Sequence, residues 1–158
     1  MTGNRKDDHL NFAAAQQREE PHRTPWDDVR LVHHALAGID AADVDISTSL
    51  PGGIRWPLPF YINGMTGGTE TTGRVNAALA EAAAETGIAI ATGSMSIYLR
   101  DETVLPTFRV LRDKNPHGFV MGNLSADATP DQVRRVVDAL EANALQIHVN
   151  SVQETVMP

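Results

Sequence analysis

Four short apolar runs recur along the second part of the chain, and they predict a repeated strand–helix unit. Each run ends in a turn rich in glycine and small polar residues. Their centres, near Ile62, Ile90, Val120 and Ile147, lie roughly 30 residues apart, a spacing typical of successive βα units with right-handed crossovers. Because the runs are mostly apolar, we expect a parallel sheet covered by helices.

Helical periodicity fills the intervals between these runs. A helix is predicted over 71–86, closed by Gly87, and a second over 102–113, closed by Asn115-Pro116. The expected buried face of the first helix consists of Val75, Ala78, Leu79 and Ala82.

The third helix has the clearest start in the chain. Thr129 is the expected N-cap, Pro130 the first helical residue, and Gln132 completes a capping box. Its expected buried face consists of Val133, Val136, Val137 and Leu140.

The first 57 residues follow a different pattern and predict a separate arm or cap. Residues 5–20 are polar and permit a helix, and the apolar-rich stretch 31–39 predicts another. Alternation over 44–48 predicts a strand, and Pro51-Gly52-Gly53 a turn, so we expect a hairpin here. The predicted division is therefore a cap over 1–57 and an α/β region over 58–158.

Two α/β architectures fit four consecutive βα units: a doubly wound open sheet and a (β/α)8 TIM barrel. A complete barrel takes roughly 250 residues. If the chain is a barrel, we therefore expect it to hold only the first four units or so, as a truncated piece.

Composition excludes several classes of function. The chain has 158 residues, no cysteine and a formal net charge of −7. Thiol catalysis, thiolate metal sites and disulfides are excluded, and broad nucleic-acid binding is disfavoured by the negative charge. We find neither an apolar run long enough for a membrane span nor a secretory signal at the N-terminus, so we expect a cytoplasmic enzyme or binding domain.

The strand ends hold the candidate chemistry, because ligands of parallel α/β folds bind at the carboxyl ends of the strands. Glycine lets the backbone approach a flat ligand, and Thr, Ser and Asn offer short hydrogen-bonding groups. The alternative is that each end is an ordinary βα turn, which favours the same residues. The four ends read Gly64-Met65-Thr66-Gly67-Gly68, Thr92-Gly93-Ser94, Gly122-Asn123-Leu124-Ser125 and His148-x-Asn150.

The fourth run places Gln146, His148 and Asn150 on one face, which in a barrel points into the lumen. A ligand or neighbouring strands would have to satisfy these polar groups, and a structural role for His148 stays open. Glu154 is a possible Mg²⁺ ligand or a solvated loop acid.

The N-terminal basic residues are a second candidate site. Arg5 and Lys6, with His9 one helical turn further on, are a possible diphosphate clamp or simply a basic patch. No G-x-G-x-x-G or Walker-type loop occurs in the sequence, which argues against a dinucleotide-binding or nucleotide-hydrolysing fold.

Taken together, these motifs resemble type 2 isopentenyl diphosphate isomerase, in order and from residue 5 to the last residue. The matching segments are Arg5-Lys6-x-x-His9-Leu10, Asn63-Gly64-Met65-Thr66-Gly67-Gly68, Thr92-Gly93-Ser94, Gly122-Asn123-Leu124-Ser125 and Gln146-Ile147-His148-x-Asn150-x-x-Gln153-Glu154-x-x-Met157-Pro158. The resemblance implies an FMN-dependent (β/α)8 barrel that interconverts isopentenyl and dimethylallyl diphosphate. It also implies Mg²⁺, NADPH as the usual reductant of the flavin, a small-molecule diphosphate substrate and a homo-oligomer.

The resemblance assigns roles to individual residues. It implies that the flavin is lined by Met65, Thr66, Gly67, Ser94 and Asn123. The substrate would be faced by His148, Asn150 and Gln153, with His148 and Gln153 as the catalytic candidates. Glu154 would bind Mg²⁺, while Arg5 and Lys6 would hold the diphosphate with support from His9.

Two departures from the family pattern matter. Many members have Gly-Ser-Gln where this chain has Gly93-Ser94-Met95, so the glutamine's role is not carried over to Met95. The family also continues past Met157-Pro158 with strands that bind the flavin phosphate, so we expect this chain alone to bind FMN weakly and not to isomerise. Two alternatives stay open: another FMN-binding barrel, such as a relative of hydroxy-acid oxidases or dihydroorotate dehydrogenase, and a non-catalytic half-barrel that self-associates.

Overall fold

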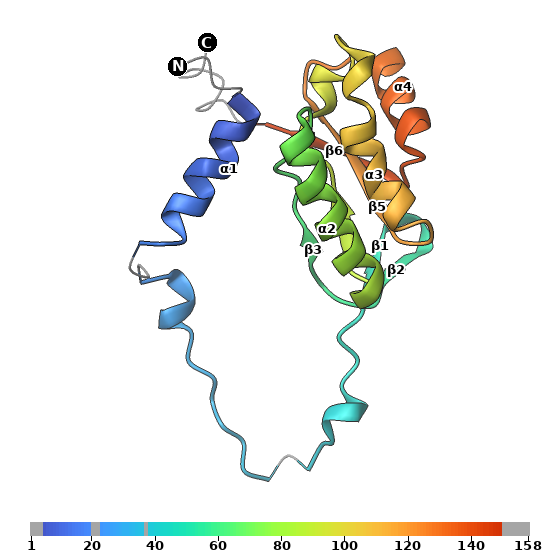
Figure 1. Cartoon of the computed structure of the whole chain (residues 1–158). Coiled ribbons are helices and arrows are strands. Elements are labelled where there is room, and N and C mark those ends of the chain that lie inside the picture. Colours follow the sequence, from blue (N-terminus) through green and yellow to red (C-terminus); the bar gives the residue numbers. More distant parts are fainter. Residues whose placement is uncertain (1–4, 20–22, 37, 150–158) are drawn as a thin grey trace.

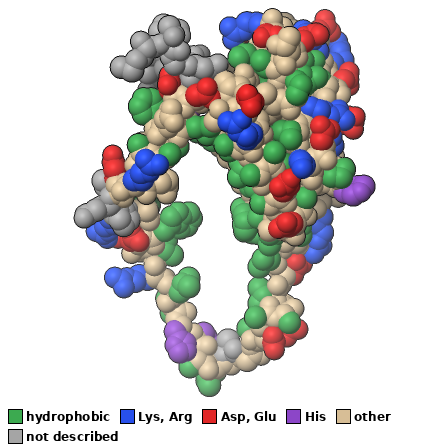
Figure 2. Space-filling view, viewed as in Figure 1, with side chains coloured by type: hydrophobic (Ala, Val, Ile, Leu, Met, Phe, Trp, Pro, Cys, Tyr) green, Lys and Arg blue, Asp and Glu red, His purple; other side chains and the backbone are tan. Residues whose placement is uncertain are grey.

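The computed structural model describes residues 5–19, 23–36 and 38–149. Helix α1 (Arg5–Gln16) confirms the helix expected near the N-terminus. It lies against the body of the protein, where the Thr69 hydroxyl donates to Asp7 Oδ1 at 2.6 Å. Between α1 and the body, the chain runs as a long arc that stands clear of the rest (Figures 1 and 2).

A four-stranded parallel sheet forms the centre of the body, as predicted. Its strands are β3 (Tyr61–Ile62), β4 (Ala89–Ala91), β5 (Val120–Ser125) and β6 (Ala144–His148). They pair in the same order as in the sequence. The intervening helices are α2 (Glu70–Thr86), α3 (Pro106–Lys114) and α4 (Pro130–Leu140).

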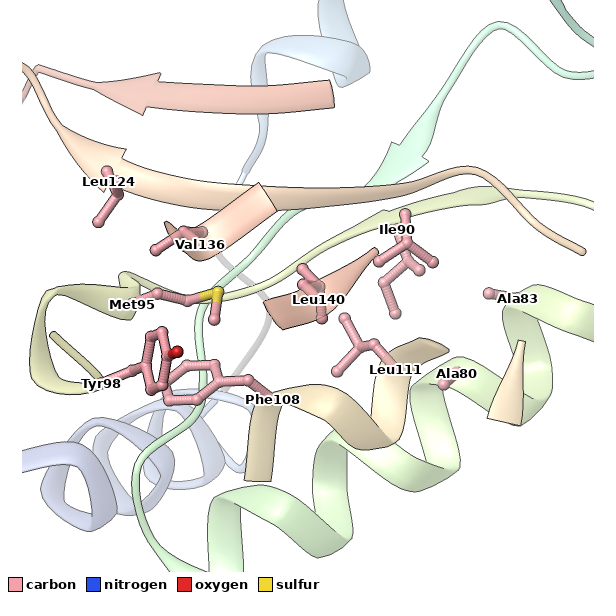
Figure 3. Close-up of a cluster of buried hydrophobic side chains, with 11 residues drawn as sticks. Ala80, Ala83, Ile90, Met95, Tyr98, Phe108, Leu111, Leu124, Val136 and Leu140 are labelled. Atoms are coloured by element: carbon pink, nitrogen blue, oxygen red, sulfur yellow. The ribbon is translucent and has the colours of Figure 1, made fainter. Parts of the chain in front are cut away.

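One face of the sheet packs on all three helices and forms the hydrophobic core (Figure 3). Ile90, Val120 and Leu124 point from the strands into this core, and each is at most 1% exposed. The helices contribute Ala80, Ala83, Phe108, Leu111, Val136 and Leu140. These helices do not cover the opposite face of the sheet, so a ligand of this sheet would lie on that face or at its rim.

A short hairpin precedes the sheet and confirms the predicted turn. Strands β1 (Thr48–Leu50) and β2 (Ile54–Trp56) are antiparallel and joined by a 3₁₀ turn over Pro51–Gly53. The Trp56 ring packs on Phe119 and Tyr61, with ring centroids 5.3 and 5.8 Å apart. Because Tyr61 begins β3 and Phe119 directly precedes β5, the hairpin covers the amino ends of the strands.

Two predictions for the arm are wrong. Residues 31–36 form no helix, and Leu31 and Val32 are more than 90% exposed. A short helix needs a packed apolar face to be stable, and here the apolar side chains meet nothing in the described part of the protein. The strand predicted over 44–48 begins only at Thr48, where the hairpin provides a pairing partner.

Two predictions for the repeated units also need correction. The buried face of α2 consists of Thr72, Asn76, Ala80 and Ala83, whereas Ala78, Leu79 and Ala82 are exposed. These small and polar residues let α2 approach the sheet and α3 closely. The helix predicted over 102–113 is a 3₁₀ turn (Glu102–Val104) followed by α3, because Pro106 lacks the backbone N–H that a continuous helix would use.

The predicted capping box of α4 is confirmed, with Gln132 N–H donating to the Thr129 hydroxyl. In its predicted buried face, Val136 and Leu140 are fully buried, while Val133 and Val137 are partly buried. Among the described residues, no helix has the length and apolar character needed to cross a membrane.

Candidate functional site

A cleft of about 1150 Å³ opens at the carboxyl ends of the strands. All three segments that follow β3, β4 and β5 contribute to its wall, as do β6 and α1. Among the residues that line it are six of those predicted for a site: Lys6, His9, Met65, Ser94, Asn123 and His148. The structure therefore brings together side chains that are far apart in the sequence.

Four of the predicted residues are not placed in this way. Asn150, Gln153 and Glu154 lie outside the described residues. Arg5 is the first residue of α1, but the structure does not describe its side chain. Within the part of the chain that is described, no cluster of three or more His, Asp or Glu side chains could hold a metal ion.

The loops after β3 and β4 are locked together beside the cleft. Gly93 N–H donates to Thr66 O at 2.9 Å. A Cβ atom on Gly64 would lie 1.7 Å from Thr92 O, so only glycine lets the two backbones approach this closely. This contact fixes the position of Met65, which is 65% exposed and lines the cleft.

Thr66 and Gly67, both predicted to line the flavin, lie behind this lining rather than in it. The Thr66 hydroxyl donates to Asn76 Oδ1, and Thr66 is only 6% exposed. Gly67 has φ +140°, and a Cβ there would lie 2.0 Å from the Phe108 ring. The Thr66 side chain therefore holds the loop on α2, and the side chain that the loop presents to the cleft is Met65.

A chain of polar side chains crosses the free face of the sheet below the cleft. Asn123 Nδ2 donates to Gln146 Oε1 at 2.7 Å, and Asn123 Oδ1 lies 2.8 Å from His148 Nδ1. Gln146 Nε2 donates to Tyr61 Oη and to Asn63 Oδ1, both at 3.0 Å. Neighbouring strands thus satisfy Gln146 and His148, two of the three residues predicted for the polar face of the fourth strand, whereas the third, Asn150, lies outside the described residues.

These contacts show that the sheet is strongly curled. Gln146 is on β6 and Asn63 directly follows β3, and two other strands lie between them. In a flat sheet three strand spacings amount to roughly 14 Å, which the side chains of Asn63 and Gln146 cannot bridge. The polar face is therefore the concave face of the sheet.

One acid at the cleft has a defined electrostatic environment. The Ser125 hydroxyl donates to Asp127 Oδ1, and this hydrogen bond lowers the pKa of Asp127 below its usual value. His148 lowers the pKa of Asp127 further through its charge. Because both residues line the cleft, its β5 and β6 side holds a carboxylate near an imidazole.

Sequence reasoning missed several residues of this site. Tyr61 and Asn63 anchor the polar chain, Asn76 holds Thr66, and Arg100 lines the cleft. Asn63 could have been predicted, because it lies at a strand end within the motif Asn63-Gly64-Met65-Thr66-Gly67-Gly68. For Asn76 the sequence offered less, because its role depends on its place on the buried face of α2.

The chain is similar to proteins named isopentenyl-diphosphate delta-isomerase. It is 55% identical to the one from Streptomyces sp. (strain CL190) and 58% identical to the one from Kitasatospora griseola, in each case over 98% of this chain and 42% of the relative. The one from Staphylococcus aureus (strain JH9) is 42% identical over 98% of this chain and 43% of its own length. No protein-family model matches the chain.

The chain thus spans less than half the length of these relatives. These relatives confirm the predicted resemblance to isopentenyl diphosphate isomerases. That name does not distinguish enzyme types, so the type 2 assignment and its flavin stay predictions.

Proposed function

We propose that this chain is part of a type 2 isopentenyl diphosphate isomerase, an FMN- and Mg²⁺-dependent cytoplasmic enzyme of isoprenoid biosynthesis. Such an enzyme converts isopentenyl diphosphate to dimethylallyl diphosphate and uses NADPH to reduce its flavin. The observation that carries the proposal is the concave polar face below the cleft, in a chain about 55% identical to proteins named for this activity.

The curled sheet supports the further proposal that residues 58–158 are the first half of a (β/α)8 barrel, with residues 1–57 as a cap. The reach from Gln146 to Asn63 across two strands requires a curled sheet, and the sheet of a barrel is curled in this way. Helices α2, α3 and α4 all cover the convex face, and the strand order follows the sequence without reversal. A doubly wound sheet would have helices on both faces and a reversal of strand order.

The residues around the cleft fit a flavin. Gly64 and Met65 line the cleft beside the closely packed β3 and β4 loops, and Ser94 and Asn123 offer hydroxyl and amide groups for the polar edge of a flat ring. Met65 would pack on the ring. Bound reduced FMN would supply the acid–base group for the proton shift.

The rest of the cleft fits a diphosphate with a short apolar tail. Lys6 and His9 bring cationic or donor groups from α1, and Arg5 lies on the same helix. His148 would donate to or accept from the substrate on the β6 side. We propose Glu154 as the Mg²⁺ ligand and Asn150 and Gln153 as further substrate contacts.

A chimera tests the proposal. The chain would be joined to the remainder of the Streptomyces relative, and conversion of isopentenyl diphosphate measured with FMN, NADPH and Mg²⁺ added or omitted. We expect turnover only when FMN, its reductant and Mg²⁺ are all present. For Glu154→Gln we expect a loss of at least about 10- to 100-fold, which is typical of losing an outer-shell partner, because Glu154 is proposed as a direct ligand.

The unmodified relative, assayed in parallel, controls for the assay, and Glu85→Gln on an exposed position of α2 controls for charge. Turnover that does not require flavin would overturn the type 2 assignment. Flavin-linked oxidation of a hydroxy acid, unaffected by Glu154→Gln, would support the oxidoreductase alternative instead.

A further inference from the structure

We infer that Asn63 and Gln146 are positioning residues that fix the tautomer of His148, so that its imidazole carries the proton on Nδ1 and presents Nε2 to the cleft. The tautomer follows from the direction of the hydrogen bonds in the polar chain on the concave face. Asparagine and glutamine amides can be turned by 180°, so this direction must be derived from a donor that cannot turn.

The backbone N–H of Gly64 is such a donor. It lies 3.0 Å from Asn63 Oδ1, so the atom of the Asn63 amide at this position must be the oxygen. A turned Asn63 would place its NH₂ group against the backbone N–H, and two donors would then face each other.

The orientation of Gln146 follows from that of Asn63. The Gln146 amide atom 3.0 Å from Asn63 Oδ1 must donate, and is therefore Nε2. Tyr61 Oη accepts a second hydrogen bond from the same nitrogen at 3.0 Å. The Gln146 oxygen, Oε1, is then directed toward β5.

Asn123 and His148 complete the sequence. Gln146 Oε1 accepts from Asn123 Nδ2 at 2.7 Å, which leaves Asn123 Oδ1 as the atom 2.8 Å from His148 Nδ1. An amide oxygen can only accept, so His148 Nδ1 must donate. In the neutral imidazole Nε2 then carries the lone pair, and Asn123, which is 5% exposed, holds the ring in place.

This arrangement has a chemical consequence for the cleft that His148 lines. Neutral His148 can only accept a hydrogen bond from a ligand through Nε2, and protonated His148 can only donate one there. A use of this nitrogen toward a diphosphate substrate rests on the proposed function, whereas the tautomer itself does not.

Nitrogen-15 NMR of the ¹⁵N-labelled full chain tests the inference directly. Long-range ¹H–¹⁵N correlations distinguish a protonated Nδ1 from a protonated Nε2, and His148→Gln identifies the resonances of His148. At a pH where the imidazole is neutral, we expect Nδ1 to be the protonated nitrogen of His148. The exposed His117, at the opposite end of the strands, provides the reference for an unconstrained ring.

Two variants test the positioning role. Gln146→Leu removes the acceptor for Asn123, and we expect the His148 tautomer to shift toward the mixture seen for His117. Asn63→Asp keeps an oxygen that accepts from Gly64 N–H and from Gln146 Nε2, and we expect it to retain the Nδ1–H form. Circular dichroism and thermal melting check that both variants are folded.

A wild-type His148 protonated on Nε2 would overturn the inference, and this result does not depend on the two positioning variants being stable. An unchanged tautomer in folded Gln146→Leu would show that Gln146 does not fix the tautomer of His148. Absence of isomerisation in the chimera would count against the proposed function and leave the tautomer result standing.

Discussion

Gly64 shows how a single missing side chain shapes the candidate site. Its Cα packs against the carbonyl of Thr92, where a Cβ would lie 1.7 Å from the oxygen. Gly64→Ala is therefore expected to lower the free energy of unfolding by about 3 kcal/mol or more, at the upper end of the cost of overpacking. Urea denaturation measures this loss.

Gly38→Ala is the matched control, because nothing lies within 4 Å of a Cβ at Gly38. We expect a change of less than about 1 kcal/mol there. Equal stability losses at the two positions would show that the contact between the β3 and β4 loops is not as close as described.

At the residue scale, the sequence indicated correctly which loops lie at the cleft. It indicated less well which side chains of those loops are exposed to the cleft. Gly64, Met65, Ser94 and Asn123 lie at the cleft or beside it, as expected from their places at strand ends. Thr66 is different, because its hydroxyl is bound to Asn76 on the following helix. A local motif contains no information about such a tertiary partner, so the buried position of the Thr66 hydroxyl could not be predicted from the sequence.

At the scale of elements, one arginine joins the ends of α3 and α4 to the starts of β5 and β6. Arg112 is 7% exposed, and it donates to the carbonyl oxygens of Asn115, Gly118 and Glu141 at 2.8–3.1 Å. It also donates to Asn143 Oδ1 at 2.7 Å, and this same oxygen accepts from Val120 N–H. Burial lowers the pKa of Arg112 from its ordinary value.

Replacing this arginine is expected to be costly. Arg112→Met leaves several buried carbonyl oxygens without a donor, so we expect a loss of about 3–5 kcal/mol, comparable to breaking a buried charged interaction. Arg134→Met removes an exposed ion pair with Asp131 and is expected to cost less than about 1 kcal/mol. Thermal and urea unfolding compare the two, and similar losses would contradict the role given to Arg112.

Elements with their own start and stop signals were predicted well. The capping box at Thr129 and the glycine at Gly87 both mark the ends of helices as expected. The segment 31–39 lacked such signals, and Leu31, Val32 and Leu36 pack on nothing in the part of the chain that the structure describes. The buried face of α2 was misplaced because small residues allow close packing, which hydrophobic spacing alone does not indicate.

At the scale of the whole molecule, exposed apolar side chains gather at the two edges of the sheet. Five of the six large apolar side chains exposed within 48–149 lie on β3 or β6 or within three residues of them: Phe60, Tyr61, Met65, Ile147 and Val149. The sixth is Leu79, on the outer side of α2. Unpaired edges with such side chains favour association with further strands.

We therefore expect the 158-residue chain alone to self-associate. Its mean mass in light scattering should rise with concentration, and Ile147→Lys should reduce this rise because a charge disfavours strand pairing at the β6 edge. Leu79→Lys changes an equally apolar residue away from both edges and should have little effect. A chain that stays monomeric at all concentrations would contradict the prediction.

The parallel sheet and its order were predictable because the apolar runs recur at a regular interval. The curvature of the sheet was not predictable, because only the hydrogen bond from Gln146 to Asn63, across two intervening strands, reveals it. Sequence spacing describes how far apart strands are along the chain and not how the sheet bends between them.

The arc between α1 and β1 has a consequence for how Lys6 and His9 reach the cleft. It tethers them covalently, so α1 docks as part of the same molecule and its local concentration depends on the length of the tether. A single protease cut within residues 29–36, all of which are exposed, would release α1 as a separate peptide. The two side chains would then occupy the cleft only in proportion to the amount of peptide in solution.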